Sequence, residues 1–246
     1  MPVVARPFPP ALPHGEIREI LPNLYFVAGT LVMPTPIAIR FSRNMTVVKE
    51  GERLVLVNAV RLDDAGLGAL DALGKVTDVL RIAGNHGMDD PFYKDRYGCK
   101  VWALRGQRYT AGFDADAPNV YMEPDVEVDT DTALPIAGAR LHVIASKPPE
   151  AVLLLPNRAL ISGDCLQNWE TSDEYFNWFG TAMMHVMGFI KPSNVGPGWL
   201  KRCKPPKDEL KAVADLDFVN LIPAHGAPVV GNARDEYRPA IDRAAR

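Results

Sequence analysis

Four places where a β-rich run ends in a polar cluster constrain the fold of this chain more than any other feature of its sequence. The clusters are NHGMDD (85–90), ASKPPEA (145–151), SGDC (162–165) and PAHG (223–226). In a fold built from two packed sheets, strand ends from distant parts of the chain converge at one edge. We therefore expect these clusters to lie close together and to carry the chemistry of the molecule.

The β-rich runs fall into two series, one before and one after a polar segment that is rich in Asp and Pro (105–137). The runs are LYFVAG (24–29), MTVVKE (45–50), RLVLVNAV (53–60), VTDVLRIAG (76–84), KVWAL (100–104), ARLHVIAS (139–146), AVLLLP (151–156) and RALISGD (158–164). Gly51 and Glu52 separate the second and third runs, which is typical of a hairpin.

Helical patterns lie between and after these runs. They cover 63–74, 207–216 and 233–245. In the first of them Leu67, Leu70 and Leu73 recur at three-residue spacing, which predicts an amphipathic helix with its apolar face on a sheet. Two sheets, each covered by helices on its outer side, account for this order, so we predict an α/β fold with the four layers of an αββα sandwich.

The length and composition favour one domain. A chain of 246 residues with 47% hydrophobic side chains buries a substantial core, so we expect a single domain over 1–246. Within it, 1–15 is predicted to be an extended arm. The segment 165–206 is predicted to be an insertion rich in aromatic residues and methionine, which forms a lid or an interface and favours a homodimer.

The net charge limits the kinds of molecule that the protein is expected to bind, and the cysteines indicate the cellular compartment. A net charge of −3 without a block of like charges argues against binding to nucleic acid or an anionic membrane, so we expect a small-molecule substrate. No apolar run resembles a signal peptide or approaches the length of a membrane span. Three cysteines without C-x-x-C spacing argue against a disulfide framework, and we expect a cytoplasmic protein.

The order and spacing of the four clusters resemble the metallo-β-lactamase superfamily over roughly residues 20–230. The first motif of that superfamily is His-x-His-x-Asp-His, and a Gly-His turn, a Gly-Asp turn and a final His-Gly follow it. His86 matches the first histidine and Asp90 the aspartate. Met88 and Pro91 stand where the other two histidines belong. The resemblance thus implies the αββα sandwich together with an incomplete metal site.

The later motifs are also partly kept. Lys147 falls where the second motif has its histidine, Asp164 matches the aspartate of the Gly-Asp turn, and His225 matches the last histidine. Asn58 stands where the family has an aspartate that supports the site. A lysine beside a metal repels it, so Lys147 is expected either to steady an oxyanion or to fill the vacated position and pair with Asp164.

The resemblance therefore implies at most one metal ion. The site that the family builds mainly from three histidines keeps only His86 and is expected to be empty. The second site is expected to hold Zn²⁺ or a similar divalent ion. Its ligands would be Asp90, Asp164 and His225, with His86 nearby. Such an ion activates water to hydrolyse an ester, thioester or amide, with His86, Lys147 and Asp90 as the candidate catalytic residues.

A metal-free alternative stays open because each candidate residue also has an ordinary structural role. An acidic residue such as Asp90 is favoured at a helix start, and His225 before a glycine suits a polar turn. His86 would be a buried hydrogen-bonded histidine and Lys147 an exposed loop lysine. In that case the chain is a non-catalytic family member that binds a ligand or another protein.

Overall fold

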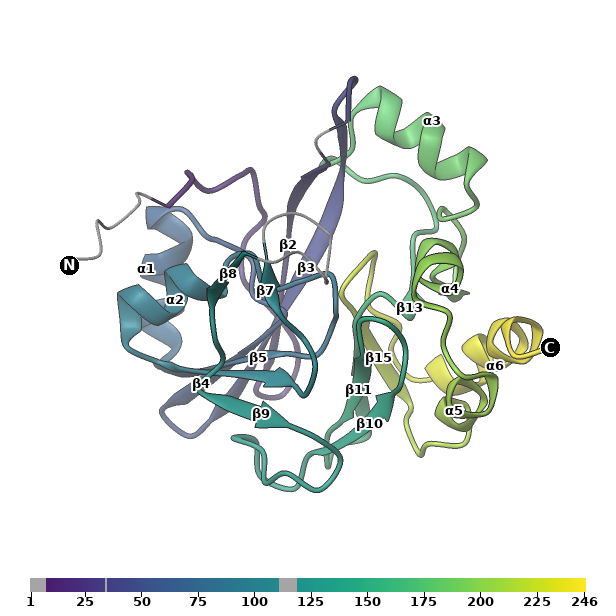
Figure 1. The fold of residues 1–246 in the computed structure, drawn as a ribbon. Helices are drawn as coiled ribbons and strands as arrows, with labels where there is room; N and C mark the ends of the chain where they lie inside the picture. Colours follow the sequence, from purple (N-terminus) through teal and green to yellow (C-terminus); the bar gives the residue numbers. More distant parts are fainter. Residues whose placement is uncertain (1–7, 34, 111–118) are drawn as a thin grey trace.

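The computed structural model describes residues 8–33, 35–110 and 119–246, and within them the chain forms two large sheets that pack face to face and two short two-stranded ladders (Figure 1). Residues 1–7 of the expected arm, and 111–118 of the polar segment, lie outside the described residues. The part of the arm that is described, 8–15, contains no helix.

The larger sheet carries the first series of β-rich runs. In order across the sheet, its strands are β1 (Arg18–Leu21), β2 (Leu24–Met33), β3 (Ile39–Glu50), β4 (Arg53–Val57), β5 (Lys75–Arg81), β6 (Lys100–Leu104) and β9 (Val126–Val128). β3 and β4 pair antiparallel, which confirms the predicted hairpin. Helices α1 (Asp64–Leu73) and α2 (Asp90–Tyr97) lie on its outer side, and α1 confirms the predicted amphipathic helix.

The smaller sheet carries the second series. Its strands, in order, are β10 (Arg140–Ile144), β11 (Glu150–Leu154), β12 (Ala159–Ser162) and β15 (Asn220–Pro223). Helices α4 (Pro197–Cys203), α5 (Lys207–Val213) and α6 (Ala233–Ala244) cover its outer side (Figure 1). The helices predicted near 207–216 and 233–245 are thereby confirmed.

Strand β4 shows how the sequence produces these layers. Successive side chains of a strand point to opposite faces, so an apolar strand feeds two cores. Leu54 and Leu56 pack toward α1 and α2, whereas Val55 and Val57 pack between the two sheets. All four side chains are fully buried, which explains why this run is continuously apolar rather than alternating.

The segment 165–206 contains elements that the sequence patterns did not predict. They are β13 (Leu166–Gln167), α3 (Trp178–Val186), β14 (Asn194–Val195) and α4. α3 lies over the outer end of the β2–β3 hairpin, away from α1, α2, α5 and α6 (Figure 1). A short β7 (Tyr109–Thr110) and β8 (Val120–Met122) ladder completes the strands of the described part, in which no helix is long and apolar enough to cross a bilayer.

Candidate metal centre

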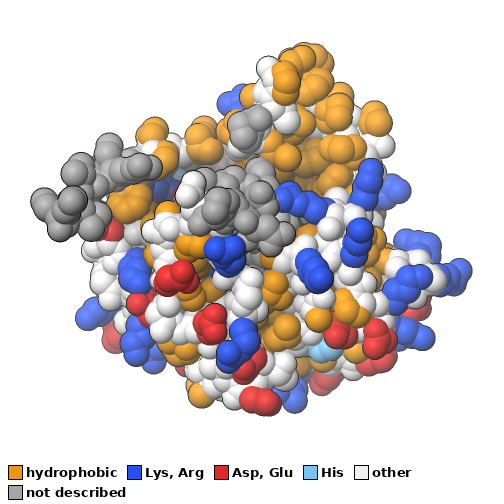
Figure 2. Space-filling view, viewed as in Figure 1, with side chains coloured by type: hydrophobic (Ala, Val, Ile, Leu, Met, Phe, Trp, Pro, Cys, Tyr) orange, Lys and Arg blue, Asp and Glu red, His pale blue; other side chains and the backbone are white. Residues whose placement is uncertain are grey.

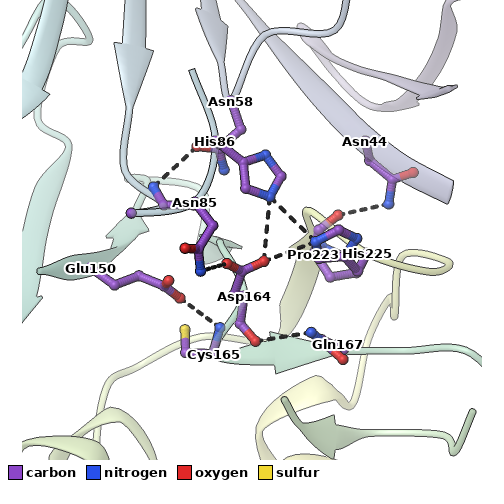
Figure 3. Close-up of polar contacts among 12 residues, drawn as sticks. Asn44, Asn58, Asn85, His86, Glu150, Asp164, Cys165, Gln167, Pro223 and His225 are labelled. Carbon is purple, nitrogen blue, oxygen red and sulfur yellow. Dashed lines mark hydrogen bonds and ion pairs between the residues drawn. The ribbon is translucent and has the colours of Figure 1, made fainter. Parts of the chain in front are cut away.

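Three buried side chains from distant parts of the chain meet between the two sheets. The Nε2 atoms of His86 and His225 are 3.3 Å apart, and both approach Oδ1 of Asp164, at 3.4 and 2.9 Å (Figure 3). Each residue offers one atom that can bind a metal, and these atoms lie within 4.8 Å of one another. The structure thus brings together three of the four residues that the resemblance implies as metal ligands.

Strand ends position all three side chains. β12 and β15 pair in parallel with Ser162 opposite Pro223, so the turns that carry Asp164 and His225 leave the smaller sheet side by side. His86 lies in the loop that follows β5 of the larger sheet. The site therefore lies where the carboxyl ends of strands from both sheets meet, as expected from the pattern of polar clusters.

Strand β3 fixes the loop of His225. The Asn44 amide donates to the carbonyl oxygens of Pro223 and Gly226, and the backbone oxygen of Ser42 bonds Nδ1 of His225 at 2.9 Å. A carbonyl can only accept, so Nδ1 carries the proton. A cation that displaces the proton shared by Nε2 and Asp164 Oδ1 would meet a neutral ring protonated at Nδ1, which is the tautomer that metal-ligating histidines use.

The three atoms have the spacing that a zinc ion requires. Metal–ligand bonds of about 2.1 Å in a tetrahedron separate neighbouring ligand atoms by about 3.4 Å. Two of the observed separations, 3.3 and 3.4 Å, match that edge, and the third, 2.9 Å between His225 and Asp164, is about 0.5 Å shorter. Two imidazole nitrogens and one carboxylate oxygen are also a usual donor set of catalytic zinc, so the residues present fit the ion.

The electrostatics of the group also favour a cation. Burial alone would raise the pKa of Asp164, but the hydrogen bonds of His225 and His86 outweigh it and hold that pKa well below its usual range. Burial lowers the pKa of His86, although Asp164 opposes the shift. The carboxyl is therefore ionised and the ring of His86 is neutral at pH 7, which are the protonation states that bind a metal.

Two further residues around Asp164 were not predicted from the sequence. The Asn85 amide donates to Asp164 Oδ2 at 2.8 Å and so fixes the carboxylate with Oδ1 toward the histidines (Figure 3). Glu150 is fully buried, and its Oε1 accepts the backbone N–H of Cys165. Both belong to polar clusters that the sequence analysis expected to converge, Asn85 in 85–90 and Glu150 in 145–151, but neither was singled out as a site residue.

The buried Glu150 gives the stability a pH dependence that Glu150→Gln should remove. Burial and the nearby Asp164 carboxylate raise the pKa of Glu150 well above its usual 4.5, so the folded protein keeps a proton that the unfolded chain loses. Its contribution to stability therefore falls as pH rises, by up to about 1.4 kcal/mol per unit. Urea unfolding of the metal-free protein measures this between about pH 5 and 8. The free energy of unfolding of Glu150→Gln should rise relative to that of the wild type as the pH increases. If the two free energies changed with pH in parallel, the raised pKa of Glu150 would be contradicted.

Asn58 holds the loop of His86. Its backbone has a positive φ of 53°, and its Oδ1 accepts the backbone N–H groups of Ile82 and Ala83, each at 3.2 Å. These are the residues that leave β5 and lead to His86. An amide therefore supports the site from the position where the resemblance implies an aspartate.

Asp90 lies outside the group of three. It begins α2, and its Oδ2 accepts a hydrogen bond of 2.6 Å from the hydroxyl of Tyr109. Burial raises its pKa to about 6, although the bond to Tyr109 and the charge of Arg81 oppose the shift. Asp90 therefore lies at the start of a helix, as the metal-free alternative expected, but its carboxyl bonds Tyr109 and does not cap the helix.

Lys147 also lies apart. Its side chain is exposed, its backbone N–H donates to the carbonyl oxygen of Cys203, and among the described residues it forms no ion pair with Asp164. The expected Lys147–Asp164 pair is thus absent, since Asn85 and the two histidines already occupy the carboxylate oxygens. The lysine does not fill the vacated metal position.

A cavity of about 320 Å³ opens above the three residues, and its walls are apolar. Asn85, His86, Asp164 and His225 line its polar end. The remaining lining residues come mainly from the β2–β3 hairpin and from the segment 165–206: Leu31, Met33, Ile39, Phe41, Gln167, Trp169, Met183, Met184, Met187, Phe189, Gly198, Trp199 and Arg202. The segment 165–206 therefore covers the candidate metal centre, in the manner of a lid.

Neither a protein-family model nor a curated protein sequence matches the chain. Solved structures match it over almost its whole length. VMB-1 has a TM-score of 0.62 and 14% identity over 94% of this chain and 98% of its own. The metallo-β-lactamase FIM-1 from Pseudomonas aeruginosa, in its mono-zinc form, has a TM-score of 0.60 and 13% identity, and the match covers 97% of this chain and 99% of FIM-1. A metallo-β-lactamase from Hirschia baltica has a TM-score of 0.57 and 15% identity, and the match covers 94% of this chain and 95% of that one.

These likenesses settle the architecture. At 11–15% identity they show the fold and do not carry over an activity. The chain has the metallo-β-lactamase fold, and the αββα sandwich predicted from the polar clusters is confirmed.

Proposed function

We propose that this protein is a metal-dependent hydrolase that holds one divalent ion, such as Zn²⁺, on His86, Asp164 and His225. The observation that carries the proposal is the convergence of three buried ligand atoms at the polar end of an apolar cavity. An ion bound there lowers the pKa of a water molecule toward neutrality and polarises the carbonyl oxygen of an ester, thioester or amide.

The residues of the chain provide binding, orientation and exclusion of water. The aromatic and methionine side chains of the cavity wall suit an apolar acyl group and keep bulk water from the reacting bond. Asn85 and the Ser42 carbonyl hold Asp164 and His225 in place, so the ligand atoms need little rearrangement. Asp90 and Lys147 have no part in this proposal, because neither lines the cavity.

A metal-free binding protein is the second candidate, and one observation favours it. Asp164 Oδ1 lies at hydrogen-bond distance from His225 Nε2, so a proton between the two groups satisfies both of them without a metal. In that form the cavity would hold a small apolar ligand without cleaving it.

Hydrolysis assays on zinc-loaded protein test the proposal. The panel contains acyl esters, acyl thioesters and acyl amides with short and medium apolar chains, because the cavity wall is apolar. We expect zinc-dependent release of the carboxylic acid from at least one class, which Asp164→Asn abolishes. Ligands that bind the cavity but are cleaved no faster by the wild type than by Asp164→Asn would contradict the hydrolase and favour the binding protein.

A further inference from the structure

Helix α3 has an apolar outer face that no part of the described chain covers. Four exposed residues lie at positions that share one face of this helix: Trp178, Ala182, His185 and Val186. Trp178 is 77% exposed and Val186 is 85% exposed. Surface helices normally present charged or polar residues on this side, whereas here only His185 is polar. Figure 2 shows the hydrophobic side chains gathered over α3 at the top of the molecule.

This helix is firmly attached to the β2–β3 hairpin. Asn177 caps α3 by accepting the N–H of Gly180, accepts a second bond from the N–H of Arg40, and donates its own amide to the carbonyl of Ala38. A Cβ at Gly180 would come within 2.2 Å of the Arg40 carbonyl oxygen, so the two backbones are in close contact. The exposed apolar side chains are therefore held in a fixed position, with Ile37, 55% exposed, at the adjacent hairpin tip.

The chain around α3 is also basic, although the whole molecule is not. The protein has 27 lysines and arginines against 30 acidic residues, yet the segment 175–207 contains no aspartate or glutamate. Its basic residues are all exposed: Lys191, Lys201, Arg202, Lys204 and Lys207. Arg202 lines the same cavity as Met183 and Met187, so the basic residues of α4 lie beside α3.

We propose that this face binds the surface of an anionic lipid bilayer. The apolar–basic face consists of the outer side of α3, Ile37 and the exposed cations Lys191, Lys201 and Arg202, which follow α3 or lie on α4 beside it. Exposed Trp and Val side chains enter the boundary between headgroups and acyl chains, and lysines and arginines beside them bind anionic headgroups. The cavity is lined by Arg202, which belongs to this face, and by Met187, which directly follows Val186, so a bilayer bound to the face would lie next to the cavity.

The charge pattern favours a bilayer over a second copy of the chain. A two-fold dimer uses the same patch on both subunits, so it would bring Lys191, Lys201 and Arg202 of one copy near the same cations of the other. Like charges at such close range weaken association. An anionic bilayer instead complements both the apolar and the basic part of the face.

Vesicle flotation tests this proposal on the full chain. The probes are vesicles of phosphatidylcholine alone and of phosphatidylcholine with phosphatidylglycerol. We expect binding to the anionic vesicles that weakens with salt and is slight on the neutral ones. Trp178→Ser with Val186→Ser should weaken binding by about tenfold or more, and Lys191→Gln with Lys201→Gln by about fivefold for each charge removed.

Matched substitutions elsewhere provide the controls. Val230 is 58% exposed and Lys75 is exposed, and both lie outside the apolar–basic face, so Val230→Ser and Lys75→Gln should leave flotation unchanged. Failure of the wild type to float with anionic vesicles would overturn the proposal, as would an equal loss in the controls. A wild-type dimer in light scattering that Trp178→Ser with Val186→Ser dissociates would also overturn it and assign the face to a second copy.

Discussion

Asp164→Asn should weaken zinc binding by at least about a hundredfold while leaving the fold intact, because it removes the charged ligand between the two histidines. The amide keeps the size of the carboxyl and can still meet Asn85, so folding loses little. The measurement is competition for zinc against a chromophoric chelator, with circular dichroism as the check on folding. The wild type and the variant are compared at the same pH, because protons compete with the metal for the histidines.

Asp90→Asn is the matched control for that experiment. Asp90 is also a buried carboxylate near the site, yet it bonds Tyr109 and lies outside the three-residue group. Its amide variant should therefore bind zinc with an affinity close to that of the wild type. A large loss of zinc in Asp90→Asn, with none in Asp164→Asn, would reverse the ligand assignment made from the structure.

Gly226→Ala should destabilise the metal-free protein by about 3 kcal/mol or more and also weaken zinc binding. Gly226 has a φ of 85°, and a Cβ there would lie 1.9 Å from the backbone oxygen of Asn168. Neither backbone can give way without moving His225, whose carbonyl oxygen accepts the N–H of Asn168. Urea unfolding measures the loss of stability, and the chelator competition measures the loss of zinc.

Gly231→Ala separates the effect of the clash from that of the backbone conformation. Gly231 has a φ of 95° but no atom within 4 Å of the position of a Cβ, so its variant shows only the conformational cost, about 1–2 kcal/mol. Zinc binding should be unchanged in it. Equal destabilisation of the two variants would mean that the contact between Gly226 and Asn168 does not hold the loop of His225.

The layers of the fold and the place of the site could be predicted from the sequence because both depend on local patterns. Apolar strands such as β4 predict a buried sheet, and a polar cluster directly after a strand predicts its end. The resemblance of these clusters to the metallo-β-lactamase motifs then named His86, Asp164 and His225 as ligands. In the structure the parallel pairing of β12 with β15 brings Asp164 and His225 together.

The remaining features depend on contacts that sequence spacing does not specify. Asp90 follows His86 closely enough to share a loop with it, but the start of α2 at Asp90 turns its carboxyl toward Tyr109. Glu150 begins an otherwise apolar strand, and its burial depends on the turn 163–165, which packs against its carboxyl and donates the N–H of Cys165 to it. The net charge is a sum over the whole chain, so it did not reveal that the segment around α3 lacks acidic residues.

The zinc content of the protein after loading and desalting tests the central claim most directly. Protein purified without chelator is incubated with excess zinc, passed over a desalting column and measured by elemental analysis. We predict about one equivalent of zinc in the wild type and in Asp90→Asn, and almost none in Asp164→Asn. Less than about a tenth of an equivalent in the wild type would contradict a metal centre built from His86, Asp164 and His225.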